Sequence, residues 1–180
     1  MNLPNKLTVL RVLLVPVFIA LFYYGQYFLA NAVFVAASLT DMLDGKIARS
    51  RNLITNFGKL MDPLADKILT TSAFVCFVAE SVMPAWMLIV ILAREFAVTG
   101  LRGVAAAEGK VIAADMTGKI KTVLQMAAII VILAALAIPG FNYAWAVWFA
   151  GRGVLWAAVA MTIISGVQYL WKGREFLDMK

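Results

Sequence analysis

Histidine is absent from the 180-residue sequence, and cysteine occurs once, as Cys76 within an apolar run. A disulfide within the chain is therefore excluded, and zinc sites built from thiolates or imidazoles are excluded as well. Without histidine, proton transfer near neutral pH falls to carboxylates, lysines or tyrosines. These absences restrict the available chemistry strongly.

Charge is also scarce, because Asp, Glu, Lys and Arg make up only 14% of the residues. Hydrophobic residues make up 63%, and the mean hydropathy is +0.89. A water-soluble domain is usually about 45–50% apolar, so this composition indicates a protein whose solvent is lipid. The formal net charge is +6, but the basic residues are scattered and flank apolar runs. We therefore expect no nucleic-acid partner.

The length suits a single membrane domain over residues 1–180, since a membrane-spanning helix needs about 20 residues. Residues 12–40 carry no charge, which favours a retained helical hairpin over a cleaved signal peptide. We predict an all-α integral membrane fold of six transmembrane helices. They are expected near Leu7–Tyr24, Phe28–Arg49, Leu60–Glu80, Pro84–Ala107, Gly118–Ile138 and Val154–Trp171.

The connecting segments differ in charge. The turns expected near 25–27, 80–84 and 139–151 contain no Lys or Arg, and Arg152 lies just beyond the third of them. Apart from Lys67 and Arg94 within predicted helices, the remaining basic residues belong to the other connections and both termini: Lys6, Arg11, Lys46, Arg49, Arg51, Lys59, Arg102, Lys110, Lys119, Lys121, Lys172, Arg174 and Lys180. By the positive-inside bias, that basic side is the cytoplasmic face of the membrane.

Four aspartates lie on this basic side of the predicted bundle. Asp41 and Asp44 are expected in the last turns of the second helix, and Asp62 and Asp66 in the first turns of the third. Residues three or four apart share a helix face, so each pair points one way, and the short connection predicts that the pairs converge. Unpaired carboxylates at a membrane span are costly and repel one another, whereas a divalent cation removes both problems. An all-oxygen set of ligands favours Mg²⁺ or Mn²⁺.

The aspartates form part of a longer pattern: Asp41-x2-Asp44-Gly45-x2-Ala48-Arg49-x8-Gly58-x3-Asp62-x3-Asp66. This pattern resembles, position for position, the signature of the CDP-alcohol phosphotransferase family. The resemblance implies six transmembrane helices, a homodimer and an active site facing the cytoplasm. It also implies a reaction in which a CDP-linked substrate gives its phospho group to an alcohol and releases CMP.

The same resemblance assigns roles to the residues of the pattern. It implies that Asp41, Asp44, Asp62 and Asp66 hold two Mg²⁺ or Mn²⁺ ions, and that Asp66 is also the general base. It further implies that Gly45 and Ala48 leave room for the cytidine and that Arg49 pairs with the diphosphate. Gly58 and, in addition to its metal role, Asp41 are counted with the residues that bind the CDP-lipid. Two-metal clamping of an in-line displacement and forked Arg–phosphate contacts are physically consistent with these roles.

A polar stripe opens the first predicted helix, where Asn5, Thr8 and Arg11 recur at intervals of three. An interfacial helix end explains it equally well. Members of the family often carry such an element near the substrate diphosphate, so we expect Asn5 and Thr8 to contact the CDP-lipid. We expect Arg11 to be available to the acceptor phosphate.

Further cations lie on the same side and are candidates for binding an anionic acceptor. They are Arg94, Arg102, Lys119 and Lys121. For Arg94, the alternative is a purely structural ion pair with Glu95. For the other three, the alternative is that their charges only set the orientation of the protein in the membrane. Gly118 would let a phosphate approach backbone N–H groups where the fifth helix begins.

Several stretches resemble the bacterial phosphatidylglycerophosphate synthases within this family. They are residues 2–18, 62–67, 93–102 and 118–122. That resemblance implies CDP-diacylglycerol as donor and sn-glycerol 3-phosphate as acceptor. A synthase of phosphatidylserine, phosphatidylinositol phosphate or cardiolipin is the nearest alternative. A small ion transporter is a remote one, because the sequence shows neither inverted repeats nor broken helices and its four aspartates cluster at one side.

Overall fold

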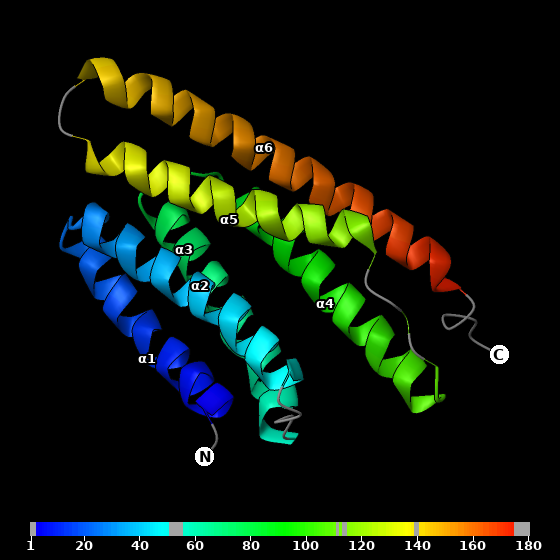
Figure 1. Ribbon diagram of the computed structural model, residues 1–180. Coiled ribbons are helices and arrows are strands. Elements are labelled where there is room, and N and C mark those ends of the chain that lie inside the picture. Colours follow the sequence, from blue (N-terminus) through cyan, green and yellow to red (C-terminus); the bar gives the residue numbers. More distant parts are fainter. Residues whose placement is uncertain (1–2, 51–55, 111, 113–114, 139–140, 175–180) are drawn as a thin grey trace.

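The computed structural model describes residues 3–50, 56–110, 112, 115–138 and 141–174, and for 3–4, 41–50, 56–57, 59–60, 141–144 and 146 it describes the backbone alone. These ranges form six α-helices and contain no strand (Figure 1). The helices are α1 (Leu3–Tyr23), α2 (Tyr27–Ser50), α3 (Asn56–Ala79), α4 (Ala85–Ala107), α5 (Met116–Ala137) and α6 (Phe141–Lys172). The predicted all-α fold of six helices is confirmed.

The sixth helix was predicted to start at Val154, and this boundary is wrong, because α6 already begins at Phe141. Most of the expected turn at 139–151 is therefore helix. Gly151 lies within this helical segment, and its backbone lies close against α5. A Cβ built on Gly151 would stand 2.9 Å from Cγ1 of Ile132, so the missing side chain allows close packing of two helices.

The ends of the helices sort into two groups. The start of α1, the end of α2, the end of α4 and the end of α6 lie toward one end of the bundle (Figure 1). The helices in one part of the bundle, α1, α2 and α3, pack on one another, while α5 packs along α6. The side of the membrane that these helix ends face stays a prediction.

The opposite end of the first three helices is held by phenylalanines. Phe18 and Phe34 lie with ring centroids 6.0 Å apart, and so do Phe22 and Phe77. Both separations fall in the range of favourable aromatic pairs, and all four rings are fully buried. This core ties α1 to α2 and α3 and leaves the other end of the helices to the polar residues.

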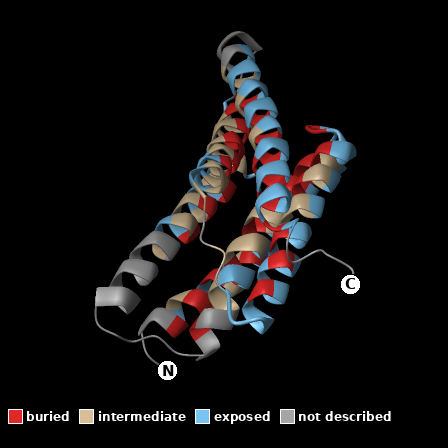
Figure 2. Ribbon diagram, turned by 90° about the vertical axis from the view of Figure 1, so that its right-hand side faces the viewer, coloured by how far each residue is buried: buried red, intermediate tan, exposed pale blue. Residues whose placement is uncertain are grey.

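The outside of the bundle is apolar as well. Leu13, Ile89 and Val123 are each more than 60% exposed, and exposed faces run along the outer helices (Figure 2). Three described helical segments are long and apolar enough to cross a bilayer: Asn5–Tyr23, Met116–Ala137 and Val147–Lys172. A shorter apolar stretch covers Tyr27–Thr40. The fold is that of a multi-pass membrane protein.

Candidate active site

The polar stripe of α1 faces into the bundle. Thr8 and Arg11 are each 1% exposed, and Asn5 is also buried. The Thr8 hydroxyl donates a hydrogen bond of 2.5 Å to Oδ1 of Asp62 on α3. A buried hydroxyl bound to a carboxylate is a specific contact, so the stripe is more than a solvated helix end.

The predicted aspartates are described to different extents. Asp62 and Asp66 lie one turn apart on α3, and both are partly buried. Gly58 is buried on the first turn of the same helix, which begins earlier than predicted and places Pro63 inside it. The backbone of α2 is helical through Ser50. The side chains of its predicted site residues lie outside the described part; these residues are Asp41, Asp44, Gly45, Ala48 and Arg49. Convergence of the two aspartate pairs therefore stays a prediction.

The described donor atoms suit a hard divalent cation. Asp62 and Asp66 offer carboxylate oxygens, and the hydrogen bond from Thr8 requires an unprotonated oxygen on Asp62. Cys76 is buried in the apolar core and offers no competing soft ligand at this end. Among the side chains that the structure describes, no three acidic or cysteine residues gather closely enough to hold an ion. The remaining predicted ligands belong to the end of α2.

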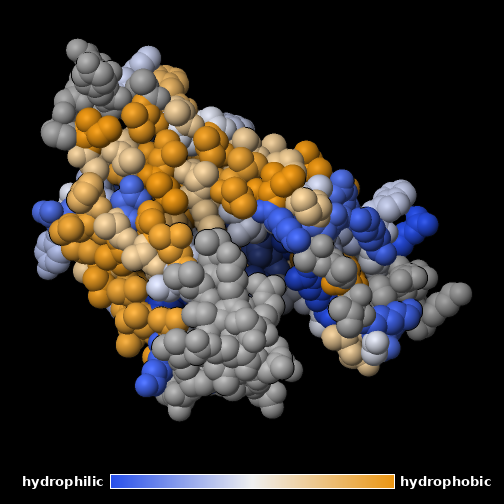
Figure 3. Space-filling view, viewed as in Figure 1, coloured by the Kyte–Doolittle hydropathy of each residue, from blue (hydrophilic) through white to orange (hydrophobic). Residues whose placement is uncertain are grey.

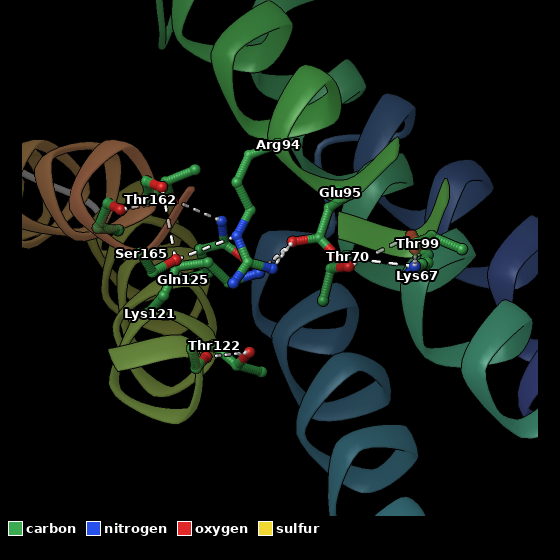
Figure 4. A network of polar contacts seen from close by, with 12 residues as sticks. Lys67, Thr70, Arg94, Glu95, Thr99, Lys121, Thr122, Gln125, Thr162 and Ser165 are labelled. Atoms are coloured by element: carbon green, nitrogen blue, oxygen red, sulfur yellow. Dashed lines mark hydrogen bonds and ion pairs between the residues drawn. The ribbon is translucent and has the colours of Figure 1, made fainter. Parts of the chain in front are cut away.

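A second polar cluster lies between α3, α4, α5 and α6, and its centre is Glu95 (Figure 4). Oε1 of Glu95 accepts hydrogen bonds from Nζ of Lys121 and, at 3.1 Å, from Nη1 of Arg94. Nζ of Lys67 lies 3.7 Å from Oε2 and donates to Oγ1 of Thr99 at 2.7 Å. One carboxylate therefore links cations from three helices.

The Arg94 side chain passes between two glycines. A Cβ on Gly166 of α6 would lie 3.0 Å from Cγ of Arg94, and one on Gly118 of α5 would lie 3.3 Å from Nη2. Nε donates to Oγ of Ser165 at 3.0 Å. The absence of side chains at these glycines thus gives the guanidinium its path. Arg94 thus forms the ion pair with Glu95 that was the structural alternative in the sequence analysis, and it also lines a cavity.

Tyr169 on α6 orients the neighbouring arginine. Its hydroxyl accepts a hydrogen bond of 2.5 Å from Nη2 of Arg102, and the same guanidinium lies 5.1 Å from the ring centroid. The guanidinium of Arg94 lies 5.6 Å from that ring. Cation–π attraction therefore adds to the hydrogen bond. Tyr169 is 3% exposed.

A stripe of buried polar residues on α6 was not predicted from the sequence. Thr162, Ser165 and Tyr169 follow at spacings of three and four, and all are buried. Such spacing places polar groups on one helix face, which would have been a usable signal. Gln125 of α5 extends the stripe by donating to Oγ1 of Thr162 at 3.3 Å.

Two cavities meet at this cluster. The first, of about 380 Å³, contains four of the five predicted acceptor-binding cations, and hydrophilic side chains surround a hollow near the start of α5 in Figure 3. The second, of about 420 Å³, is lined by apolar side chains such as Leu92 and Phe96 and by polar ones that include Asp66 and Lys67. Glu95, Lys121 and Thr122 line both. The first cavity is lined by Arg94, Glu95, Arg102, Asp115, Gly118, Lys119, Lys121, Thr122, Val123 and Tyr169.

Arg11 is the predicted acceptor cation that the structure places elsewhere. It lies on α1 with Asn5 and Thr8, whereas the other four line the first cavity. The two groups of cations are thus carried by different parts of the bundle.

Asp115 closes the cavity at the start of α5. Its Oδ1 accepts from the backbone N–H of Met116 at 2.7 Å, and its Oδ2 lies 2.6 Å from Nζ of Lys172. The hydrogen bond from Lys172, followed by that from Met116, holds the pKa of the Asp115 carboxyl below its usual value. The pair links the start of α5 to the end of α6 on the surface.

The sequence is similar to known proteins over nearly its full length. A family model described as CDP-alcohol phosphatidyltransferase matches residues 1–164. The CDP-diacylglycerol–glycerol-3-phosphate 3-phosphatidyltransferase of Bacillus subtilis is 44% identical over an alignment of 191 positions, gaps included, that covers 98% of this chain and 97% of that protein. A probable phosphatidylglycerophosphate synthase of Mycobacterium tuberculosis is 39% identical over 94% of this chain and 80% of its own length. The Escherichia coli protein with the same name as that of B. subtilis is 34% identical over 98% of this chain and 93% of its own.

Proposed function

Since this chain belongs to the CDP-alcohol phosphatidyltransferase family, we propose that it transfers the phosphatidyl group of CDP-diacylglycerol to sn-glycerol 3-phosphate. The products are phosphatidylglycerophosphate and CMP. The names of the relatives supply both substrates, and identities of 34–44% over nearly the whole chain support carrying them to this protein. The chain is then a membrane-bound transferase of phospholipid synthesis.

The cation-lined cavity is the observation that carries the choice of acceptor. Arg94, Arg102, Lys119 and Lys121 surround it, and it meets the cavity of Asp66 at Glu95. A phosphate monoester carries about 1.5–2 negative charges near pH 7, which suits such a lining. The phosphate of a short acceptor in the first cavity leaves its other end directed toward Asp66.

Asp66 is the base in this proposal. Its carboxylate takes the proton from the primary hydroxyl of the acceptor, and the oxygen then attacks the lipid-side phosphorus. A new O–P bond forms, the diphosphate O–P bond breaks, and CMP leaves. With histidine absent, a carboxylate beside the acceptor cavity is the natural group for this step.

The family uses divalent metal, and Asp41, Asp44, Asp62 and Asp66 are the residues proposed to hold two Mg²⁺ or Mn²⁺ ions. When bound, such ions neutralise the charge on the attacking and leaving oxygens. The hydroxyl of Thr8 fixes one oxygen of Asp62, which orients the second oxygen of that carboxylate. Asn5, Gly45, Ala48, Arg49 and Gly58 complete the proposed CDP-lipid site.

The proposal extends to the setting of the enzyme. The basic helix ends support a cytoplasmic active site in the bacterial inner membrane, where water-soluble partners have access. The two-chain donor would enter from the bilayer. The homodimer implied by the resemblance is retained as part of the proposal.

An acceptor panel tests the function. Purified protein is supplied with CDP-diacylglycerol, Mg²⁺ or Mn²⁺ and one acceptor at a time, and CMP release is followed. We expect release with sn-glycerol 3-phosphate and little with serine, inositol phosphate or phosphatidylglycerol. Release with one of those three but not with glycerol 3-phosphate would assign the chain to another branch of the family.

A further inference from the structure

The second cavity, of about 420 Å³, lies at the outer surface of the bundle and is lined by residues of α3, α4 and α5. Leu64, Ile68 and Phe96 belong to its lining, and each is more than 40% exposed. In a multi-pass membrane protein, exposed apolar side chains such as these face the lipid. The cavity is therefore accessible to a molecule that resides in the bilayer.

Polar and apolar residues line this cavity at different depths. The helix α3 begins at the polar end of the bundle and runs toward the buried phenylalanines. Asp66 and Lys67 line the shallow end of the cavity, whereas Phe74 and Ile91 line the deep end and belong to the apolar core. At 1.5 Å per residue, Asp66 and Phe74 are about 12 Å apart along the axis of α3. A polar head group suits the shallow end, and hydrocarbon suits the deep end.

Two hydroxyl groups lie between these ends. Thr71 and Ser72 line the cavity about one helical turn deeper than Lys67, and their hydroxyls make no hydrogen bond with any residue that the structure describes. The neighbouring hydroxyl of Thr70, in contrast, donates to the backbone oxygens of Asp66 and Lys67 at 3.1 and 3.2 Å. Because a hydroxyl away from water is costly without a partner, a ligand that brings an acceptor to this depth is favoured.

From this arrangement we infer that the cavity holds the diacylglycerol part of the donor, and that Thr71 and Ser72 donate hydrogen bonds to its ester carbonyls. The inference rests on the proposed function, which brings the lipid-side phosphorus of the donor to Asp66. In a phospholipid, the ester carbonyls lie between the phosphate and the acyl chains, and the lining of the cavity follows the same order. The acceptor cavity meets this one at Glu95, so the two substrates approach each other there. The chain then distinguishes ester-linked from ether-linked lipids.

The test compares CDP-diacylglycerol with its dialkyl ether analogue, in which CH₂ replaces each ester carbonyl while the chain lengths and the configuration are kept. Each donor is supplied at a series of mole fractions in detergent micelles, and CMP release with glycerol 3-phosphate gives its KM. For the wild-type protein, the KM should be about threefold to tenfold higher for the ether donor, as the loss of a hydrogen bond requires. In the double variant Thr71→Val/Ser72→Ala, the KM for the ester donor should rise to that of the ether donor, so the ratio of the two falls to about one.

Thr70→Val is the matched control, because Thr70 lines the same cavity but directs its hydroxyl to its own helix. It should keep the wild-type ratio. A merely structural role of Thr71 and Ser72 would raise both KM values alike, so an active double variant with an unchanged ratio would overturn the inference. If that variant does not fold, the wild-type protein decides, since equal KM values for the two donors refute the inference alone. Wild-type protein that releases no CMP from either donor with glycerol 3-phosphate refutes the proposed function and, with it, this inference.

Discussion

The aspartate side of the site, formed by Asp62 and Asp66 with Thr8, and the cation side, formed by Arg94, Arg102, Lys119, Lys121, Glu95 and Tyr169, are built in different ways. On the aspartate side, two carboxylates lie one turn apart on α3, and one hydroxyl from α1 fixes the nearer of them. On the cation side, most of the charged groups contact residues of other helices. Ser165, for example, lies 71 positions from Arg94.

This difference separates two kinds of expected effect. In the proposed function, groups on the aspartate side act on the reacting phosphorus and hydroxyl, so their loss should lower kcat or the use of the donor. In the same proposal, groups on the cation side hold the acceptor, so their loss should raise the KM for glycerol 3-phosphate. A cation-side variant that lowered kcat with an unchanged KM would break the comparison.

The largest effect is expected for Asp66→Asn. The amide cannot take the proton of the acceptor, so kcat should fall by about 10²–10⁴-fold, the usual contribution of a general base. Binding of the CDP-lipid, measured by isothermal titration in detergent, should remain largely intact. Asp115→Asn removes a carboxylate that lies outside the Asp66 cavity and serves as the control. Near-normal turnover in Asp66→Asn would remove this residue as base.

Thr8→Val should have the next largest effect on the aspartate side. It deletes the hydroxyl that donates to Asp62 while keeping the shape of the side chain. A hydrogen bond to a charged group is worth about 1.5–3 kcal/mol, so kcat/KM for CDP-diacylglycerol should fall about tenfold or more. Thr8→Ser retains the hydroxyl and should recover most of the loss. A uniform loss in both variants would point to packing of α1 instead.

Gly166→Ala tests the path of Arg94 on the cation side. The new methyl group would stand 3.0 Å from Cγ of Arg94, which must then shift. We expect the KM for glycerol 3-phosphate to rise by roughly fivefold, with little change in kcat, since displacement of one cation weakens binding of the phosphate. Gly153→Ala on the same helix meets no atom within 4 Å and should be neutral. Equal effects of the two substitutions would show that α6 responds to alanine in general.

Tyr169→Phe should give a smaller effect on the same side. It removes the acceptor of the Arg102 hydrogen bond but keeps the ring beneath both guanidinium groups. The KM for glycerol 3-phosphate should rise by about threefold, as expected for one hydrogen bond among several contacts. Tyr169→Leu removes the ring as well and should raise the KM further. Kinetics at several acceptor concentrations separate this change from any change in kcat.

Lys172→Met should have the smallest effect, because Asp115 and Lys172 lie on the surface. The lowered pKa of Asp115 means that the pair stabilises the folded protein above the unfolded-state pKa, about 3.9. That contribution is lost as the pH falls through the folded-state pKa. Thermal unfolding in detergent should therefore show a small deficit for Lys172→Met at pH 7 that disappears in acid. Lys6→Met serves as a surface control, and a deficit that grew in acid would contradict the assignment.

The aspartate side was the more predictable from sequence, because helical spacing determines which residues share a face. The intervals of three in Asn5, Thr8 and Arg11 predicted a polar stripe, and the structure buries it against Asp62. The number of helices was also predictable, because it followed from the lengths of the apolar segments.

The cation side was less predictable, because its contacts join distant helices. Nothing in the local sequence of Tyr169 indicates that Arg102 will donate to it. The start of α6 was predicted too late, because residues 139–151 were expected to form a turn. Gly151, within that range, lies close to Ile132 and so has a packing role. Five cations were assigned to one anion site from their side of the membrane, and this criterion could not separate Arg11 from the other four.

The path of Arg94 between Gly118 and Gly166 also bears on how the protein is made. Ser165, which accepts from Arg94, and Lys121, which donates to Glu95, follow both residues in the chain, so α4 is synthesised before these partners exist. During that interval, the described contacts leave Arg94 and Glu95 with each other and with Lys67 of the preceding helix. The pair of opposite charges on adjacent residues thus serves the nascent chain as a temporary neutralisation, which the later helices complete.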